Sequence, residues 1–133
     1  MCRVLYVEDD ADAAAALAEY LRAAGLVPVL AGSGEKALLM LDGGLPDGNV
    51  DLLITDLALP GMDGAELCRI LRADQTHCHL PIILLTGVRQ RMGIEITQND
   101  QTWLPADRIL DKAISPEEIL IVVRELLEKA HPV

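Results

Sequence analysis

The segment Arg3-Val4-Leu5-Tyr6-Val7-Glu8-Asp9-Asp10 is a short apolar run that ends in three acidic residues. Apolar side chains at successive positions indicate a strand that is buried on both faces, as the strands of parallel sheets are. Similar runs of strand length recur along the chain, and most of them also end at a polar residue. They lie at 27–31, 50–55, 82–85 and 108–110. The sequence therefore predicts five strands.

Segments of helical character separate these strands. Residues 11–24 place apolar side chains at helical spacing, and Ser33 and Asp63 stand where helix caps are expected. Residues 115–118, Ser-Pro-Glu-Glu, begin a further helix with a cap, a proline and an acidic third position. This alternation predicts one α/β domain over residues 1–133, a doubly wound five-stranded parallel sheet with five helices.

Composition argues against several classes of protein. Acidic residues number 21 against 11 Lys and Arg, giving a net charge of −10 and no basic stripe, so we expect no direct contact with nucleic acid. No apolar run has the length of a membrane span or of a signal peptide, so we expect a cytoplasmic protein without membrane contact. The three cysteines form no CxxC pair, and His77, Cys78 and His79 are interpreted as a polar loop rather than a metal site.

Reactive side chains follow four of the five predicted strands. They are Glu8 and Asp9 after the first strand, Asp56 after the third, Thr86 after the fourth and Lys112 after the fifth. Because the carboxyl ends of parallel strands meet at one edge of the sheet, we expect these side chains to lie together. Three adjacent carboxylates repel one another, and oxygen ligands without His or Cys favour Mg²⁺ as the cation that neutralises them.

Such an edge suits the transfer of a phosphoryl group to a carboxylate. Asp56 is a suitable nucleophile for forming an aspartyl phosphate, and a magnesium ion would reduce the charge that repels the incoming group. Lys112 would offer a point charge to one phosphoryl oxygen, and Thr86 would donate a hydrogen bond to another. The residues alone thus predict a phosphoacceptor site at Asp56.

The chain resembles the receiver domains of bacterial two-component response regulators along essentially its whole length. Four segments carry the resemblance, in order and with matching spacing; they lie at 4–10, 51–64, 81–87 and 111–112. It implies a flavodoxin-like, single-domain receiver similar to chemotaxis regulators. It also implies that Glu8 and Asp9 hold Mg²⁺, the first through water, that Asp56 is both phosphoacceptor and ligand, and that the carbonyl of Ala58 completes the metal shell. Thr86 would move towards the phosphoryl group, and Lys112 would pair with it.

The resemblance further implies partners and a mode of action. The donor would be a phosphohistidine on a sensor histidine kinase or a histidine phosphotransfer protein. The chain would catalyse only its own phosphorylation and dephosphorylation and would otherwise not be an enzyme. No output domain follows in these 133 residues, so we expect signalling to an unknown protein target by changed contacts. A single-domain regulator, a relay protein and a piece of a longer chain all stay open.

Four features set this chain apart from the family pattern. Ala113 follows Lys112, where receivers usually have a proline, and the cis bond often seen there is strongly disfavoured before alanine. Ile109 occupies the position of an aromatic switch residue, so we expect a muted change on the output face. Ala58 and Val88 are apolar and cannot orient an attacking water, so we expect a long-lived phosphorylated state. The long stretch 88–106, which contains Trp103, is interpreted as a packed loop in which a long regular helix is doubtful.

Other interpretations are weaker. A phosphatase with an aspartyl nucleophile needs a second aspartate two residues further on, where this chain has Ala58. A flavin-binding electron carrier is disfavoured because no phosphate-binding loop follows the first strand and aromatic residues are scarce. A degenerate receiver that docks independently of phosphorylation stays open because of Ala113 and Ile109.

Overall fold

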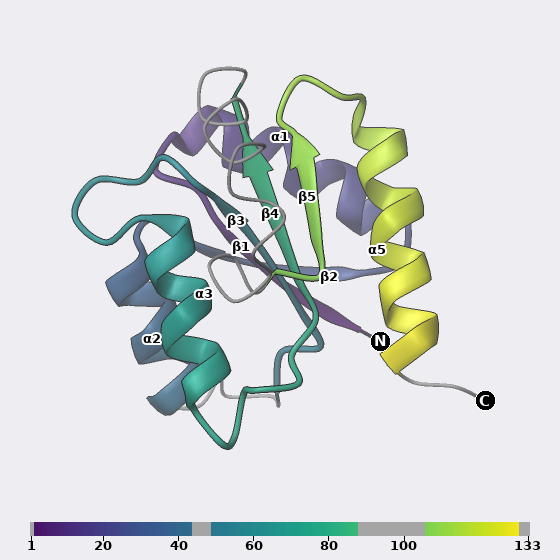
Figure 1. Cartoon of the computed structure of the whole chain (residues 1–133). Coiled ribbons are helices and arrows are strands. Elements are labelled where there is room, and N and C mark those ends of the chain that lie inside the picture. The colour runs from purple at the N-terminus through teal and green to yellow at the C-terminus, as the bar shows by residue number, and fades with distance from the viewer. Residues whose placement is uncertain (1, 44–48, 88–105, 131–133) are drawn as a thin grey trace.

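A computed structural model describes residues 2–43, 49–87 and 106–130 (Figure 1). Five parallel strands form one sheet in the order β2-β1-β3-β4-β5. They are β1 (Arg3–Val7), β2 (Val27–Ala31), β3 (Leu52–Asp56), β4 (Ile82–Thr86) and β5 (Arg108–Asp111). The predicted five-stranded parallel sheet is confirmed, and every strand begins and ends within two residues of its predicted bounds.

Helices lie on both faces of this sheet, as the alternation of elements predicts. In the described part of the chain they are α1 (Ala11–Ala23), α2 (Gly34–Gly43), α3 (Gly64–Ala73) and α5 (Pro116–Ala130). Figure 1 shows α1 and α5 on one face, and α2 and α3 on the other. Five helices were expected, and these are four. Most of the interval between β4 and β5, residues 88–105, lies outside the described residues, so the interpretation of that stretch and of Trp103 stays a prediction.

Side chains satisfy the free backbone groups at the helix starts. Asp63 Oδ1 accepts a hydrogen bond from the Glu66 amide at 2.8 Å, and Ser33 Oγ accepts one from the Lys36 amide at 3.1 Å. A cap of this kind satisfies one of the N–H groups that the first helical turn leaves unpaired. The predicted caps Ser33 and Asp63 are therefore confirmed.

The core forms two layers because successive strand residues point to opposite faces of the sheet. Val4 and Tyr6 of β1 pack with residues of α1 and α5, whereas Leu5 and Val7 pack with residues of α2 and α3. Both sets are almost fully buried. This two-sided burial explains why β1 reads as a continuous apolar run.

The strand order places a topological switch between β1 and β3. From β1 the chain crosses to β2 on one side, and from β3 it continues to β4 and β5 on the other. In open α/β sheets the crevice at such a switch, outside the carboxyl ends of the strands, is where ligands bind. Among the described residues, no helix combines the length and apolarity needed to cross a bilayer.

Candidate phosphoacceptor and metal site

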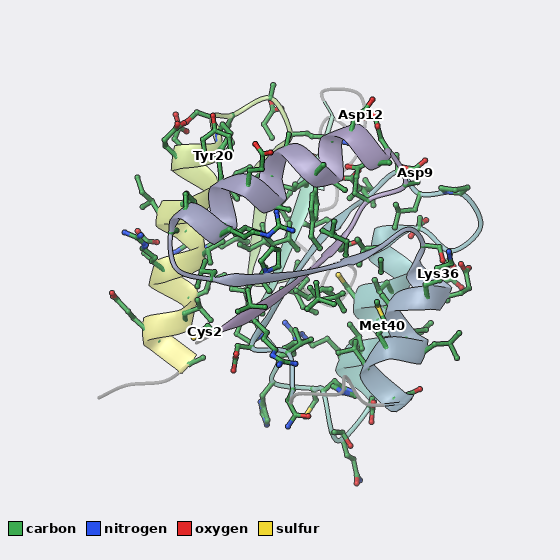
Figure 2. The ribbon with its side chains drawn as sticks, turned by 180° about the vertical axis from the view of Figure 1, so that it is seen from behind. Cys2, Asp9, Asp12, Tyr20, Lys36 and Met40 are labelled. Carbon is green, nitrogen blue, oxygen red and sulfur yellow. The ribbon has the colours of Figure 1, made fainter. Side chains whose placement is uncertain are left out.

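Three carboxylates converge at the carboxyl ends of β1 and β3. Glu8 and Asp9 follow β1 directly and Asp56 ends β3, and the two strands pair in register at Val7 and Thr55. Oxygens of the three side chains lie within 4.8 Å of one another. Glu8 and Asp56 are each 3% exposed, whereas Asp9 is exposed and lies beside the first turn of α1 (Figure 2). The pairing of β1 with β3 thus brings the three acids together, as the sequence predicts.

The Lys112 ammonium lies between the two buried carboxylates. Its Nζ is 2.7 Å from Asp56 Oδ2 and 2.8 Å from Glu8 Oε2. The strand end positions this side chain, because the Lys112 amide donates a hydrogen bond to the Thr86 carbonyl at 2.8 Å. One cation is therefore shared by two acids, and a net negative charge remains at the site.

The loop after Lys112 holds its position without the family's proline. The Ala113 amide donates a hydrogen bond to Asp111 Oδ1 at 2.8 Å, a bond that a proline cannot make. No cis peptide bond occurs among the described residues. The departure at Ala113 therefore leaves Lys112 in contact with Asp56.

Glu8 is held by more partners than the sequence indicates. The Asp10 amide donates to Glu8 Oε1 at 3.0 Å, and the Tyr6 hydroxyl donates to Glu8 Oε2 at 3.1 Å. Tyr6 is 2% exposed, and burial, with the charges of Asp56 and Glu8, raises the pKa of its hydroxyl far above the usual range. Tyr6 therefore stays protonated and acts as a donor.

Sequence reasoning did not identify Tyr6 as part of this site. A signal was present, because residues two apart on a strand point to the same face and a buried tyrosine hydroxyl needs a hydrogen-bond partner.

Two buried oxygens at this edge lack a hydrogen-bond partner within the described residues. In the described part of the chain, Asp56 Oδ1 and Thr86 Oγ1 are the buried side-chain atoms that lack a hydrogen bond. They belong to adjacent strands, since Asp56 ends β3 and Thr86 ends β4. Buried polar groups are nearly always satisfied, so two such atoms at one edge indicate a place for a ligand.

The pKa values of the two buried acids shift in opposite directions. Burial raises the pKa of Asp56 to about 7; Glu8 adds to the rise and Lys112 opposes it. Burial also raises the pKa of Glu8, but hydrogen bonds with Asp56, Lys112 and the Asp10 amide outweigh it and bring the pKa to about 2. Without a further cation, the pair formed by Asp56 and Glu8 therefore holds a proton at higher pH than two separate carboxylates would.

Two hydrogen bonds hold the loop between β3 and α3 in place. Glu35 Oε1 of α2 accepts a hydrogen bond from the Met62 amide at 3.1 Å. At the other end, the Gly64 amide donates to the Leu57 carbonyl at 2.9 Å. A Cβ at Gly64 would collide with the Asp56 carbonyl, so this position requires glycine. The exposed Ala58 lies in this loop, two residues after Asp56.

The donor set fits a hard divalent cation. The acids contribute only oxygen, and one of these oxygens, Asp56 Oδ1, is buried and has no hydrogen-bond partner in residues 2–43, 49–87 and 106–130. In the part of the chain that the structure describes, three carboxylates share one ammonium group, which leaves negative charge that a cation would neutralise. These are the properties expected of an Mg²⁺ site, which takes oxygen ligands and keeps some of its waters.

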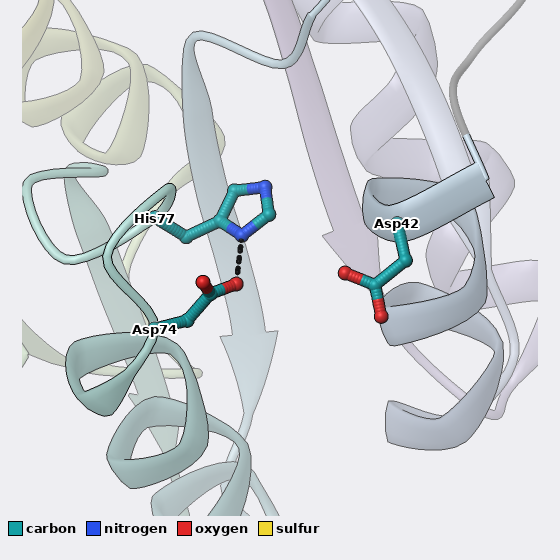
Figure 3. Close-up of side chains that lie close together, drawn as sticks. All are labelled: Asp42, Asp74 and His77. Carbon is teal, nitrogen blue, oxygen red and sulfur yellow. Dashed lines mark hydrogen bonds and ion pairs between the residues drawn. The ribbon is translucent and has the colours of Figure 1, made fainter.

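A second group of possible ligands lies at the far end of α2 and α3. Figure 3 shows Asp42 facing Asp74 and His77, whose oxygens and nitrogen lie within 4.8 Å of one another. His77 Nδ1 lies 2.6 Å from Asp74 Oδ2, and this hydrogen bond lowers the pKa of Asp74. Unlike the Asp56 group, these residues have no buried orphan atom among the described ones. The hydrogen bond between Asp74 and His77 explains why these two side chains lie together, and the unpartnered buried oxygen favours the Asp56 group as the candidate site.

Comparisons with known proteins agree with this geometry. The model of the response regulator receiver domain family matches residues 4–124. The transcriptional regulatory protein BaeR of Escherichia coli is 33% identical over 134 residues, covering 98% of this chain and 50% of the relative. The DNA-binding response regulator MtrA of Mycobacterium tuberculosis is 34% identical over 127 residues, covering 96% and 51%. The chain therefore spans about half the length of these curated relatives.

Solved structures show the same fold. A signal receiver domain of a histidine kinase from Syntrophus aciditrophicus superposes with a TM-score of 0.86 and 26% identity, covering 100% of this chain and 95% of that one. The response regulator TrrA from Thermotoga maritima, solved in complex with Mg(2+)-BeF, gives 0.77 and 29%, covering 95% and 99%.

The fold and the acidic edge define a receiver module of two-component signalling. The chain belongs to the response regulator receiver domain family. Receiver domains in general bind Mg²⁺ at an acidic pocket and interact with histidine kinases.

Proposed function

We propose that Asp56 is the phosphoacceptor of this receiver and takes a phosphoryl group from a phosphohistidine. The observation that carries the proposal is the pair of buried, unpartnered oxygens, Asp56 Oδ1 and Thr86 Oγ1, among the described residues. The Asp56 carboxylate is a group able to attack phosphorus, and the Thr86 hydroxyl is able to donate to a phosphoryl oxygen.

The transfer exchanges one bond for another. A carboxylate oxygen of Asp56 bonds to phosphorus as the bond between phosphorus and the donor's imidazole nitrogen breaks. The electron pair returns to the imidazole ring, which remains on the donor protein. Lys112 already lies 2.7 Å from Asp56 Oδ2, so its ammonium is in place to pair with the new charge. The chemistry needs positioning and charge neutralisation rather than acid–base catalysis.

The residues that would hold Mg²⁺ are Glu8, Asp9, Asp56 and the carbonyl of Ala58. When bound, the cation supplies the positive charge that lets an anionic phosphoryl group approach Asp56. The two roles of Asp56 are compatible, because a carboxylate has two oxygens.

Phosphorylation would act on the protein's partners. A phosphoryl group adds charge and acceptor oxygens at the rim of the sheet, so Lys112 and Thr86 would take new partners and the adjoining surface would change. The proposed donor is a sensor histidine kinase or histidine phosphotransfer protein, the proposed location of this chain is the cytoplasm, and the proposed output is a changed contact with a further protein. The chain would catalyse only the formation and loss of its own aspartyl phosphate.

Intact mass spectrometry after incubation with acetyl phosphate tests this proposal. We expect the mass of one phosphoryl group to appear with Mg²⁺ and not with EDTA. Asp56→Asn should abolish the gain, whereas Asp42→Asn, which makes the same change at the second acidic group, should retain it. Absence of any gain in the unmodified chain with Mg²⁺ would support the alternative, a receiver that docks without phosphorylation.

A further inference from the structure

The hydroxyl of Tyr6 lies inside the acidic site but takes no part in the proposed chemistry. Tyr6 is 2% exposed on β1 and packs in the core layer beneath α1 and α5. The other buried residues of this strand are aliphatic, so packing alone does not require a hydroxyl here. Burying a hydroxyl is unfavourable unless it forms a hydrogen bond, and this one donates to Glu8 Oε2 at 3.1 Å.

The Tyr6 hydroxyl contacts the same oxygen of Glu8 as the Lys112 ammonium does. Glu8 Oε1 accepts from the Asp10 amide, whereas Glu8 Oε2 is shared by the Tyr6 hydroxyl and the Lys112 ammonium. In the proposed function Lys112 pairs with the phosphoryl group. Among the described residues, the Tyr6 hydroxyl would then be the side-chain donor that stays on Glu8 Oε2.

We propose that Tyr6 is a positioning residue that holds the Glu8 carboxylate in place for binding Mg²⁺. This inference rests on the proposed function. A carboxylate already fixed by a donor behind it needs little rearrangement when a cation arrives. The hydroxyl belongs to a strand buried on both faces, so it is a rigid support, unlike the half-exposed Lys112 side chain. Tyr6 would thus orient Glu8 by a hydrogen bond, as outer-shell residues orient the ligands of other metal sites.

The test is calorimetric titration of Mg²⁺ into the Tyr6→Phe variant. Loss of an outer-shell partner weakens metal binding about tenfold or more, so we expect about a tenfold rise in the dissociation constant. Tyr20→Phe is the matched control, because Tyr20 lies on α1 with 40% exposure, outside the acidic site. It should bind Mg²⁺ like the unmodified chain.

A double-mutant cycle with Glu8→Gln distinguishes positioning from a general loss of stability. If Tyr6 acts through Glu8, adding Tyr6→Phe to Glu8→Gln should change the dissociation constant little. An equal weakening in both backgrounds, or unchanged affinity in Tyr6→Phe alone, would overturn the inference while leaving the proposed function intact. If the unmodified chain fails to bind Mg²⁺, both the inference and the proposed function fall.

Discussion

At the scale of single residues, the site depends on one ammonium group between two buried carboxylates. Lys112 Nζ contacts both Asp56 and Glu8, although the lysine side chain itself is 43% exposed. We expect Lys112→Ala to lower the free energy of unfolding in EDTA at pH 8 by about 1–2 kcal/mol. Removing one partner of a buried ion pair costs more than this, but solvent screens the half-exposed lysine and reduces the effect. Added Mg²⁺ should recover much of this loss. The exposed Lys36, changed to Ala, serves as control; equal effects of the two substitutions in chemical denaturation would contradict this role.

The pKa of Asp56 makes the stability of the metal-free chain depend on pH. Because burial raises this pKa to about 7 in the folded state, folding takes up a proton, and the resulting stability is lost as the pH rises through that value. The lowered pKa of Glu8 works in the opposite direction, but at more acidic pH. We therefore expect the free energy of unfolding in EDTA to fall between about pH 5 and pH 8.

The free energy of unfolding should depend less on pH in Asp56→Asn, and also in the unmodified chain when Mg²⁺ is present. Urea denaturation at several pH values measures it. A metal-free chain that is more stable at pH 8 than at pH 5 would show that another group dominates.

The predicted site residues were accessible from sequence because each follows a strand. Glu8, Asp9, Asp56, Thr86 and Lys112 all stand at the carboxyl edge of the sheet, while their roles stay predictions. Tyr6 and the contact of Lys112 with Glu8 were not predicted. Both depend on side-chain distances across strands, and a strand pattern gives only the face on which a side chain lies.

At the scale of elements, α3 is anchored against the end of β3 by the small size of Gly64. A methyl group there would collide with the Asp56 carbonyl and approach Leu84 Cδ1 to 2.9 Å. We expect Gly64→Ala to lower the free energy of unfolding by about 1–3 kcal/mol, because overpacking outweighs the roughly 1 kcal/mol that alanine adds to a helix. Gly32→Ala is the control, since nothing lies within 4 Å of a Cβ there. If both variants unfold at the same denaturant concentration, the anchoring role is wrong.

The muted change predicted for the output face depends on Ile109, which lies on β5. Ile109 is half-buried and packs against the small cluster of Ala65 and Leu84, where an aliphatic side chain has no ring to turn inward. We expect amide chemical shifts on adding Mg²⁺ and beryllofluoride to change most around Asp56 and Thr86 and little along β5. Ile109→Tyr should spread the changes into β5 and α5. Changes at Ile109 in the unmodified chain as large as those at the site would contradict a muted response.

Strands and helix starts were predictable because their signals are local. Apolar runs define the strands, and Ser33, Asp63 and Ser115 cap helices as expected, each accepting a hydrogen bond from an amide three residues on. The expected slow loss of the phosphoryl group depends on Ala58 and on Val88. Ala58 is exposed, and Val88 lies outside the described residues, so this expectation stays a prediction.

At the scale of the whole molecule, the order of the strands in the sheet determines which side chains meet at the candidate site. The sequence indicates this order only indirectly. Alternation predicts a parallel sheet, but the placement of β1 between β2 and β3 arises from contacts between distant segments. That placement puts the acids of β1 beside Asp56 and leaves the orphan oxygens at the same rim. The sheet thus assembles a site from residues that lie between positions 8 and 112 of the chain.

Chemical trapping of the acyl phosphate tests the central claim most directly. After phosphorylation with acetyl phosphate and Mg²⁺, borohydride reduces an aspartyl phosphate to homoserine, and tandem mass spectrometry of the peptides locates the converted residue. We predict homoserine at position 56 alone, and none when EDTA replaces Mg²⁺. Homoserine at another aspartate, or an unconverted Asp56 in a chain that has gained phosphoryl mass, would contradict the account.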